Sequence, residues 1–365
     1  MKIPFVDLTA QYQSIKNEID NAIKNVIDET AFIKGKYVDD FERNYENVYG
    51  IKHCISCANG TDAIYIALKA LGVGPGDEVI TVANSWISTA ETITQAGAKP
   101  VFVDIDPNFF TIDVNLIEQK ITSKTKVIIP VHIFGQACDM DSIVSLCKKY
   151  NLYLIEDCAQ AHFAEWDGKR VGTFGDIATF SFFPSKNLGA YGDAGGIITN
   201  NSDLARKMRV YSNHGALKRH EHEIEGINSR MDGIQAAILS IKLKYIQNWN
   251  QERINNSNYY NQILKGIPDL ITPEVNSKSK HVYHLYVVRV KNRDKIISIL
   301  EKNGIGNGIH YPMPLPFLKA YEYLAHKPSD FPVAYEYKNS ILSLPMYPEL
   351  TTFQMDTVKN VLCSI

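Results

Sequence analysis

Two segments of the sequence combine a largely apolar run with a reactive group at its end. Residues 153–157 end in Asp157, and residues 178–185 are followed directly by Lys186. A lysine just after a buried strand must be desolvated or paired, because an unpaired buried charge is costly. Partial burial lowers the lysine pKa and makes its amine a nucleophile toward carbonyl groups. Each residue alone has a simpler explanation, since Asp157 could cap a turn and Lys186 could form a structural salt bridge.

Together the two residues predict a site for pyridoxal phosphate (PLP). PLP needs a lysine that forms a Schiff base with its aldehyde and a carboxylate that pairs with its pyridinium nitrogen. The ion pair keeps that nitrogen protonated, so that the ring can accept electrons from a carbanion. Asp157 and Lys186 supply both groups from the ends of neighbouring strand-like segments.

Two further motifs could hold the phosphate and the ring of this cofactor. Gly60 and Thr61 follow a strand-like segment and open a helix-like one; the N–H groups and dipole of a helix start bind anions, and glycine permits close approach. Trp86 follows the strand-like residues 78–82 and could cover a flat ring, a contact worth about 0.5–1.5 kcal/mol beyond area burial. The alternatives are an ordinary N-cap turn and a core tryptophan.

The elements that would carry these residues alternate between strand and helix patterns. We expect strands at 54–57, 78–82, 100–104, 126–132, 153–156, 179–182 and 196–199, with helices at 62–71, 88–96, 139–150 and 203–212. Such alternation predicts an α/β sandwich around a mostly parallel sheet, whose ligands bind beyond the carboxyl ends of the strands.

After this region the pattern changes. Residues 234–249 predict one long helix, followed by a strand at 284–290, a helix at 293–302 and a proline-rich loop at 312–332. We therefore expect a large PLP-binding domain at 1–245 and a small C-terminal α+β domain at 246–365.

Composition excludes several classes of protein. A net charge of −2 gives no general attraction to nucleic acid or to an anionic membrane. No apolar run is long enough to span a bilayer, and the first residues do not have a signal-peptide pattern, so we expect a cytoplasmic protein.

Cys54 and Cys57 have CxxC spacing but no second ligand pair, and His220 and His222 lie in a polar stretch, so neither pair predicts a metal site.

Several motifs, in order along the chain, resemble the nucleotide-sugar aminotransferases of the DegT/DnrJ type. They are residues 59–63 (NGTDA), Trp86, residues 156–162 (EDCAQAH), 181–189 (SFFPSKNLG), 228–232 (NSRMD) and 310–312 (HYP). The resemblance extends from residue 3 to residue 348. It implies the aspartate-aminotransferase fold (PLP fold type I) and a homodimer with active sites at its interface.

The resemblance also implies a role for each matching residue. Lys186 would form the Schiff base and then move the proton, Asp157 would pair with the ring nitrogen, and Trp86 would stack on the ring. Gln160 would lie near the ring hydroxyl. The phosphate ligands would be Gly60, Thr61 and Ser181, joined by Asn228 of the partner subunit. The residues facing the substrate would be His162, Arg230, His310 and Tyr311.

The implied reaction is ping-pong. L-Glutamate would convert PLP to pyridoxamine phosphate, and a nucleotide-linked keto-sugar would then take the amine. Residues 186–193 (KNLGAYGD) resemble members that aminate C3 of the sugar, which favours a dTDP-linked 3-keto-6-deoxyhexose as substrate and a 3-amino-3,6-dideoxyhexose for surface glycans as product. A UDP-linked 3-keto uronate and amination at C4 are the alternatives.

Three other functions fit the sequence less well. A nicotinamide dehydrogenase would need a glycine-rich turn between a strand and a helix, whereas residues 72–76 (GVGPG) follow a helix and precede a strand. A non-catalytic sensor would have no need for Lys186 with its Asp157 partner. A sugar dehydratase of this fold would carry histidine in place of the lysine.

Overall fold

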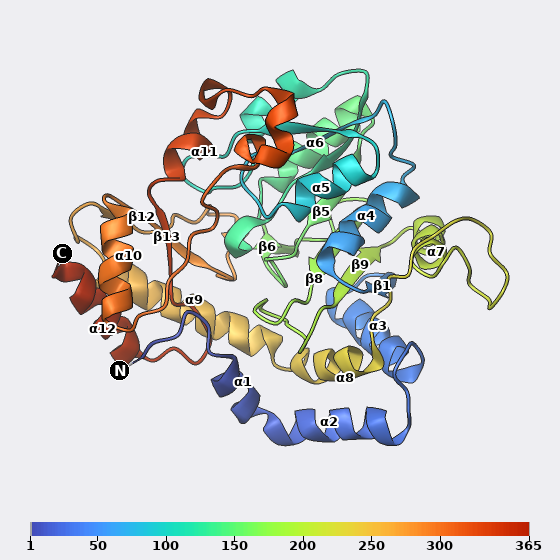
Figure 1. The fold of residues 1–365 in the computed structure, drawn as a ribbon, viewed down its shortest axis with the longest axis horizontal. Helices are drawn as coiled ribbons and strands as arrows, with labels where there is room; N and C mark the ends of the chain where they lie inside the picture. The colour runs from blue at the N-terminus through green and yellow to red at the C-terminus, as the bar shows by residue number, and fades with distance from the viewer. Residues whose placement is uncertain (1, 365) are drawn as a thin grey trace.

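The computed structural model describes residues 2–364. A seven-stranded sheet lies at its centre (Figure 1), in the order β1-β9-β8-β5-β4-β2-β3. The strands are β1 (His53–Cys57), β2 (Glu78–Val82), β3 (Lys99–Val103), β4 (Thr125–Ile129), β5 (Tyr153–Asp157), β8 (Ile177–Ser181) and β9 (Gly195–Thr199). All neighbours are parallel except β9, which runs antiparallel to both β1 and β8. The sheet is therefore mixed and mostly parallel, as expected.

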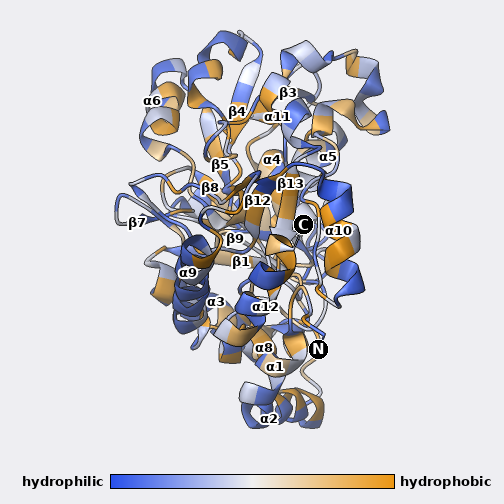
Figure 2. Ribbon diagram, turned by 90° about the vertical axis from the view of Figure 1, so that its left-hand side faces the viewer, coloured by the Kyte–Doolittle hydropathy of each residue, from blue (hydrophilic) through white to orange (hydrophobic). Residues whose placement is uncertain are grey.

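Apolar side chains leave this sheet on both faces. Ile128 packs in one hydrophobic core and its neighbour Ile129 in another, because successive side chains of a strand point to opposite faces. Helices α4 (Gly60–Ala70), α5 (Ser88–Gln95) and α7 (Ser202–Tyr211) contribute to the second core, and helix α3 (Lys36–Tyr49) and helix α6 (Met140–Tyr150) to the first. Figure 2 shows the apolar strands enclosed between helices. This is the predicted three-layer α/β/α arrangement.

A second unit has its own core beside the large sheet. Its sheet, β10-β12-β13, comprises β10 (Leu270–Ile271), β12 (Tyr286–Val290) and β13 (Ile341–Leu344), packed with α9 (Ile246–Ile263), α10 (Arg293–Lys302) and α12 (Thr352–Cys363). Ile3 bridges to Ile305 and packs in this core, so the start of the chain joins the unit that its end forms. The division of the chain at residue 245 stays a prediction.

The remaining elements are short or peripheral. They are α1 (Leu8–Ser14), α2 (Lys16–Asp28), α8 (Gly233–Lys242) and α11 (Pro332–Tyr337), with a small sheet of β6 (Glu165–Trp166), β7 (Lys169–Arg170) and β11 (Ser279–Lys280). The proline-rich loop contains short 3-10 turns, among them Leu315–Phe317 and Lys319–Leu324. Within residues 2–364, every helix is too short or too polar to cross a bilayer.

The single helix expected at 234–249 is wrong, because the chain turns after Lys242 and starts a new helix at Ile246. The first segment, α8, packs against α2 and α3. The second, α9, packs against the C-terminal unit through buried polar side chains, with Arg253 donating to the carbonyl oxygen of Met346 at 2.8 Å. The two helices pack against different parts of the protein, and the change of direction between them lets each helix bury one of its faces.

Candidate active site

A cavity of about 530 Å³ opens beyond the carboxyl ends of β5 and β8, and segments distant in sequence contribute its walls. Nine of the residues singled out from the sequence line it: Gly60, Thr61, Trp86, Asp157, Gln160, Ser181, Lys186, His310 and Tyr311. The first seven come from the large sheet and its loops, and the last two come from the C-terminal unit. The structure therefore brings these nine residues together at the strand ends, where ligands of such sheets bind.

Lys186 lies at the tip of a short loop after β8. Its backbone N–H donates to the Phe183 carbonyl at 2.8 Å, and the Ala190 N–H closes the loop on the Phe182 carbonyl at 2.7 Å. Gly189 permits this fold, since a Cβ there would lie 2.3 Å from the Pro184 carbonyl oxygen. Burial lowers the pKa of the Lys186 amine to about 8, against the attraction of Asp157, which raises it. The amine is thus held in the cavity and partly deprotonated near neutral pH.

Asp157 ends β5 and is fixed by four hydrogen bonds. Its carboxylate accepts from the Thr89 hydroxyl at 2.9 Å and from the Ala159 N–H at 3.1 Å. Its backbone bonds Pro130 and His132, both at 3.0 Å. Burial raises the pKa of the carboxyl, while these two donors and Lys186 lower it. A cation placed in the cavity beside this carboxylate would offset its desolvation, and a protonated ring nitrogen would be such a cation.

A buried pair of side chains, His132 and Glu156, holds the end of β5, the strand that carries Asp157. The Cys138 N–H donates to His132 Nδ1 at 3.0 Å, so Nε2 carries the ring proton and donates to Glu156 at 3.2 Å. Glu156 also accepts from three backbone N–H groups, those of Gly172, Phe174 and Gly175, at 2.6–2.8 Å. His132, Glu156 and Cys158 lie close enough to hold a metal ion, but the ligand atoms of the first two are committed to these bonds. The group therefore fixes the ends of β4 and β5.

Aromatic and amide groups form the wall opposite the sheet. The Gln160 side chain accepts from the Phe134 N–H at 2.7 Å and donates to the Tyr311 hydroxyl at 2.9 Å. Tyr311 lies beside Trp86, with ring centroids 5.9 Å apart. Trp86 is 59% exposed, although it lines the cavity, so the protein itself does not cover the face of its ring. The wall has room for a flat heteroaromatic group.

The other end of the cavity has the features of an anion site. Gly60 begins α4, and a Cβ on it would lie 2.7 Å from Cβ of Ser181. The Thr61 hydroxyl bonds the Ser88 hydroxyl at 2.6 Å. The first N–H groups of a helix have no partner within the helix and can bind a phosphate. Gly60 thus brings the helix start against the end of β8, as a phosphate ligand would require.

Three predicted residues lie elsewhere. His162 is fully buried beneath β8, where Nε2 donates to the Ser181 carbonyl at 2.9 Å and burial lowers the ring pKa to about 4. The structure corrects the expectation that His162 faces the substrate, because aromatic rings of the core enclose it. Asn228 is exposed, and Arg230 lines a second, smaller cavity. Neither reaches the active-site cavity of its own chain.

The cavity lining also includes residues that the sequence did not single out, among them Thr89 and His284. Thr89 lies in the first turn of α5 and bonds the Asp157 carboxylate at 2.9 Å; its position after the strand-like residues 78–82 and Trp86 could have identified it as a strand-end residue. His284 comes from the segment before β12, and its Nδ1 lies 3.3 Å from the Asn187 side-chain oxygen. Nothing local marks His284, since its place depends on docking of the second unit.

Comparison with known proteins places this geometry among sugar aminotransferases. A model of the DegT/DnrJ/EryC1/StrS aminotransferase family matches residues 13–363. The dTDP-3-amino-3,6-dideoxy-alpha-D-galactopyranose transaminase of Aneurinibacillus thermoaerophilus is 44% identical, over 98% of this chain and 97% of its own. The UDP-2-acetamido-2-deoxy-3-oxo-D-glucuronate aminotransferase of Pseudomonas aeruginosa is 42% identical, over 96% of each chain.

Solved structures agree with these relatives. DesV of S. venezuelae, in complex with a ketimine intermediate, is 36% identical with a TM-score of 0.97, over 100% of this chain and 98% of that one. NtdA of Bacillus subtilis, with bound pyridoxamine phosphate, is 32% identical with a TM-score of 0.90, over 99% and 84%. These likenesses confirm the predicted fold class.

Proposed function

Because this chain belongs to the DegT/DnrJ/EryC1/StrS aminotransferase family, we propose that it moves an amino group from L-glutamate to C3 of a dTDP-linked 3-keto-6-deoxyhexose. The product is a 3-amino-3,6-dideoxyhexose for surface glycans. Family membership confirms the predicted enzyme class and its PLP cofactor. One observation carries the proposal: Lys186 and Asp157 line a single cavity beside the uncovered ring of Trp86.

The residues present fit PLP at each of its ends. Bound PLP supplies an aldehyde that takes up an amino group and a ring that draws electrons from the reacting carbon. Asp157 would hold the proton on the ring nitrogen, and the ion pair would offset the desolvation that raises the pKa of its carboxyl. Trp86 would cover the ring. Gly60, Thr61 and Ser181 would bind the phosphate, and Gln160, fixed by Phe134, would orient the ring edge.

Lys186 is the base of the proposed reaction. With a pKa of about 8, its amine is in part neutral near neutral pH and can take a proton at Nζ from the substrate carbon. The same amine returns the proton in the second half-reaction, so one lysine serves both and no further carboxylate pair is needed. His310, which bonds the Ser343 hydroxyl at 2.8 Å, and Tyr311 line the cavity from the C-terminal unit, where the sugar would lie.

The position of amination is inferred from the segment after the lysine. Residues 186–193 have the pattern of C3-aminating members, and the names of both relatives describe sugars substituted at C3. The relative from Pseudomonas aeruginosa supports a UDP-linked 3-keto uronate as the alternative substrate, and C4 amination is the other alternative. Steady-state assays with glutamate and 3-keto or 4-keto sugars, each linked to dTDP or UDP, distinguish them. A preference for a 4-keto sugar would contradict the C3 assignment.

We also propose that the enzyme is a homodimer in which Asn228 reaches the phosphate end of the partner's cavity. Asn228 is exposed in its own chain, and Phe32, Ile33 and Leu217 are large apolar side chains exposed near the same segment, a combination typical of an interface. Mixing Lys186→Ala and Asn228→Ala chains tests this. Shared sites restore about a quarter of the wild-type activity in the mixture, since one intact site forms in each mixed dimer. If each active site instead forms within one chain, mixing the two variants restores no activity.

A further inference from the structure

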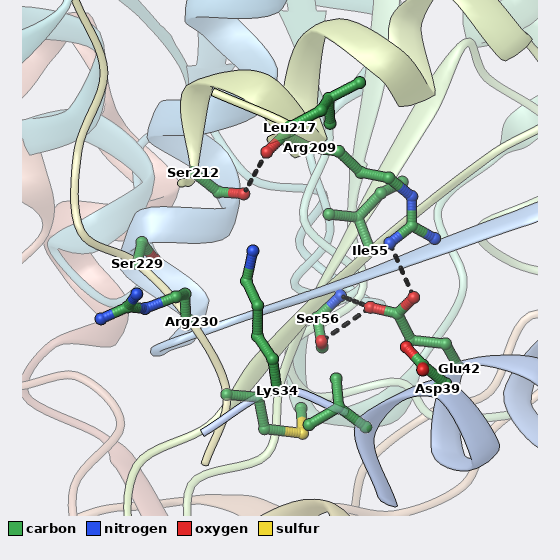
Figure 3. Close-up of a pocket in the computed structure, with 12 residues that line it drawn as sticks. Lys34, Asp39, Glu42, Ile55, Ser56, Arg209, Ser212, Leu217, Ser229 and Arg230 are labelled. Carbon is green, nitrogen blue, oxygen red and sulfur yellow. Dashed lines mark hydrogen bonds and ion pairs between the residues drawn. The ribbon is translucent and has the colours of Figure 1, made fainter. Parts of the chain in front are cut away.

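The polar groups that line a cavity differ in how far the protein itself bonds them. In the smaller cavity (Figure 3), both oxygens of Glu42 are bonded: one lies 2.7 Å from Nη1 of Arg209, and the other accepts from the Ser56 hydroxyl at 2.7 Å. His284 lines the active-site cavity and, within residues 2–364, is bonded at one of its two ring nitrogens. The other nitrogen is therefore available to a ligand of that cavity.

A chain of side-chain amides decides which nitrogen of His284 carries the ring proton. Nδ2 of Asn250 donates to the His162 carbonyl at 2.8 Å, so its Oδ1 accepts, also at 2.8 Å, from Nδ2 of Asn187. The same Nδ2 of Asn187 donates to the Val282 carbonyl at 3.0 Å, which leaves Oδ1 of Asn187 facing Nδ1 of His284 at 3.3 Å. An amide oxygen can only accept. Nδ1 therefore carries the proton, and Nε2 is the nitrogen with a free lone pair.

Burial keeps this ring neutral. His284 is 8% exposed, and burial, together with the charge of Lys186, lowers the pKa of its ring well below the ordinary value. At neutral pH Nε2 can thus accept a hydrogen bond and cannot donate one. Unlike the Tyr191 hydroxyl, which is enclosed without a partner, Nε2 keeps accessible surface. Because His284 lines the active-site cavity, this acceptor faces the space where a substrate would lie.

The two substrates of the proposed reaction differ in what they offer to such an acceptor. The amino group of L-glutamate is the group that is transferred, and its two carboxylates have no proton to donate at neutral pH. A hexose carries hydroxyl groups, each with an O–H that can donate. His284 enters the cavity from the C-terminal unit, as His310 and Tyr311 do, on the side where the sugar would lie. A buried acceptor there favours the sugar, because an unpaired acceptor is costly when a ligand excludes water from it.

We propose that Nε2 of His284 accepts a hydrogen bond from a hydroxyl of the sugar substrate, and that Asn187 holds the ring in the tautomer that permits this bond. The inference rests on the proposed function and deepens it, because it names a residue that distinguishes the sugar from the amino acid. His284 is a substrate-binding residue in this account. Asn187 is a positioning residue, since it acts through the ring of His284.

Two substitutions separate the two nitrogens of His284. In His284→Asn the side-chain amide lies where Nδ1 was and can still bond Asn187, but no atom replaces Nε2. In His284→Gln the amide lies at the same distance along the side chain as Nε2, so its oxygen can accept from the sugar. The first variant therefore removes the proposed contact and keeps the bond to Asn187, and the second restores the contact.

The test follows each half-reaction of the PLP-loaded enzyme by cofactor absorbance, with L-glutamate or with the dTDP-linked 3-amino-3,6-dideoxyhexose as amino donor. We expect His284→Asn to raise the KM for the aminosugar about tenfold, the loss of one buried hydrogen bond, and to leave the glutamate half-reaction unchanged. His284→Gln restores most of the affinity. Calorimetry of the aminosugar with the pyridoxamine phosphate form, which cannot react with it, should show the same differences in Kd without turnover.

His281→Asn is the matched control. His281 is another buried histidine of the same segment, but it lies outside the lining of the active-site cavity, and its Nδ1 accepts from the Tyr283 N–H at 2.9 Å. An asparagine oxygen can replace that acceptor, so this variant should react with both amino donors as the wild type does. The Tm values of all variants check that each one folds.

Two results would overturn the inference. Equal aminosugar KM and Kd values in the wild type and His284→Asn would show that Nε2 does not contact the sugar. Equal slowing of both half-reactions in His284→Asn, without recovery in His284→Gln, would assign His284 a structural role. A wild-type enzyme that reacts with glutamate but with no nucleotide-linked aminosugar would refute the proposed function, and this inference with it. That outcome is distinct, because it appears in the wild type, whereas the role of His284 is judged by the difference between variants.

Discussion

Two lysines in this protein have amines with similarly lowered pKa values and different surroundings: Lys186 is partly exposed to its cavity, and Lys242 is fully buried. Burial lowers the pKa of both Lys186 and Lys242 to about 8. Lys186 lines the cavity of about 530 Å³ with Asp157. Lys242 lies in α8 with no exposed surface, donates to the Gly189 carbonyl at 2.7 Å and stands 4.4 Å from the centre of the Tyr191 ring. A lowered pKa therefore reports burial, and access to a cavity with a suitable partner distinguishes the reactive amine.

The two lysines are also linked through the chain. Gly189, which accepts from Lys242, closes the loop whose tip carries Lys186. The Gln235 side chain, also from α8, accepts from the Tyr191 N–H at 2.9 Å. Helix α8 thus anchors this loop through two hydrogen bonds, and the tip of the loop lines the cavity. In the proposed reaction Lys186 would do the chemistry, and Lys242 would position the loop that presents it.

The largest effect is expected for Lys186→Ala. Removing the nucleophile and base should lower amination by at least about a thousandfold, because no other amine lines the cavity within residues 2–364. The variant should keep its fold and bind PLP without the absorbance of the lysine-linked cofactor. Activity assays and absorbance spectra check both points. Residual turnover near the wild-type rate would refute the role of Lys186.

Asp157→Asn should have the next largest effect. An amide cannot hold the ring nitrogen's proton, so we expect kcat to fall by about a hundredfold or more. Burial raises the pKa of Asp157, so the folded protein binds this proton more tightly than the unfolded chain. The free energy of unfolding of the cofactor-free wild type therefore falls as pH rises from the ordinary pKa of an aspartate to the raised one.

The same variant removes that pH dependence, which urea titrations from pH 3 to 7, at intervals of about one unit, can measure. We expect the cofactor-free Asp157→Asn protein to be at least as stable as the wild type at neutral pH. A large loss of stability together with the loss of activity would instead assign Asp157 a structural role.

Lys242→Met should lower kcat by about tenfold or less. Replacing a buried charge with an apolar side chain of similar length is often neutral for stability, but the loop loses its bond to Gly189. Retention of PLP during gel filtration and the kcat and KM values measure the effect. If Lys242→Met abolished the reaction as completely as Lys186→Ala, the contrast between the two lysines would be wrong.

The smallest expected effect is on the pH dependence of stability in the alkaline range. The folded pKa of each lysine, about 8, lies below the ordinary value of 10.5, so the unfolded chain binds more protons between these values. The free energy of unfolding of the cofactor-free protein therefore gains a rising contribution from about pH 8 to 10.5. Each single Lys→Met variant should lose part of this rise, and the double variant most of it. Identical pH profiles for all four proteins would contradict the burial of these amines.

Local patterns were enough to find the residues at strand ends. Asp157 and Lys186 follow apolar runs; the observed β5 ends at Asp157, and Lys186 lies on the loop that directly follows β8. The position of Gly60 at the start of α4 was likewise visible in the order of strand, turn and helix.

What the sequence could not reveal depends on packing between distant segments. His162 follows the same turn as Gln160, yet it points under the sheet, because the core aromatics offer it space there. The break between α8 and α9 separates two helices that pack on different units, although the helix-spaced apolar residues Ile234, Ile238, Ile241 and Tyr245 continue up to the start of α9. Lys242 has the sequence context of an ordinary helix residue, and only the fold places Gly189 within its reach.

The most direct test of the central claim is to reduce the PLP-loaded enzyme with borohydride and map the modified peptide by mass spectrometry. We predict that the phosphopyridoxyl group is found on Lys186, and that Lys242, although its pKa is lowered equally, remains unmodified. Modification of Lys242 or of another lysine in place of Lys186, or no covalent label at all, would contradict the account.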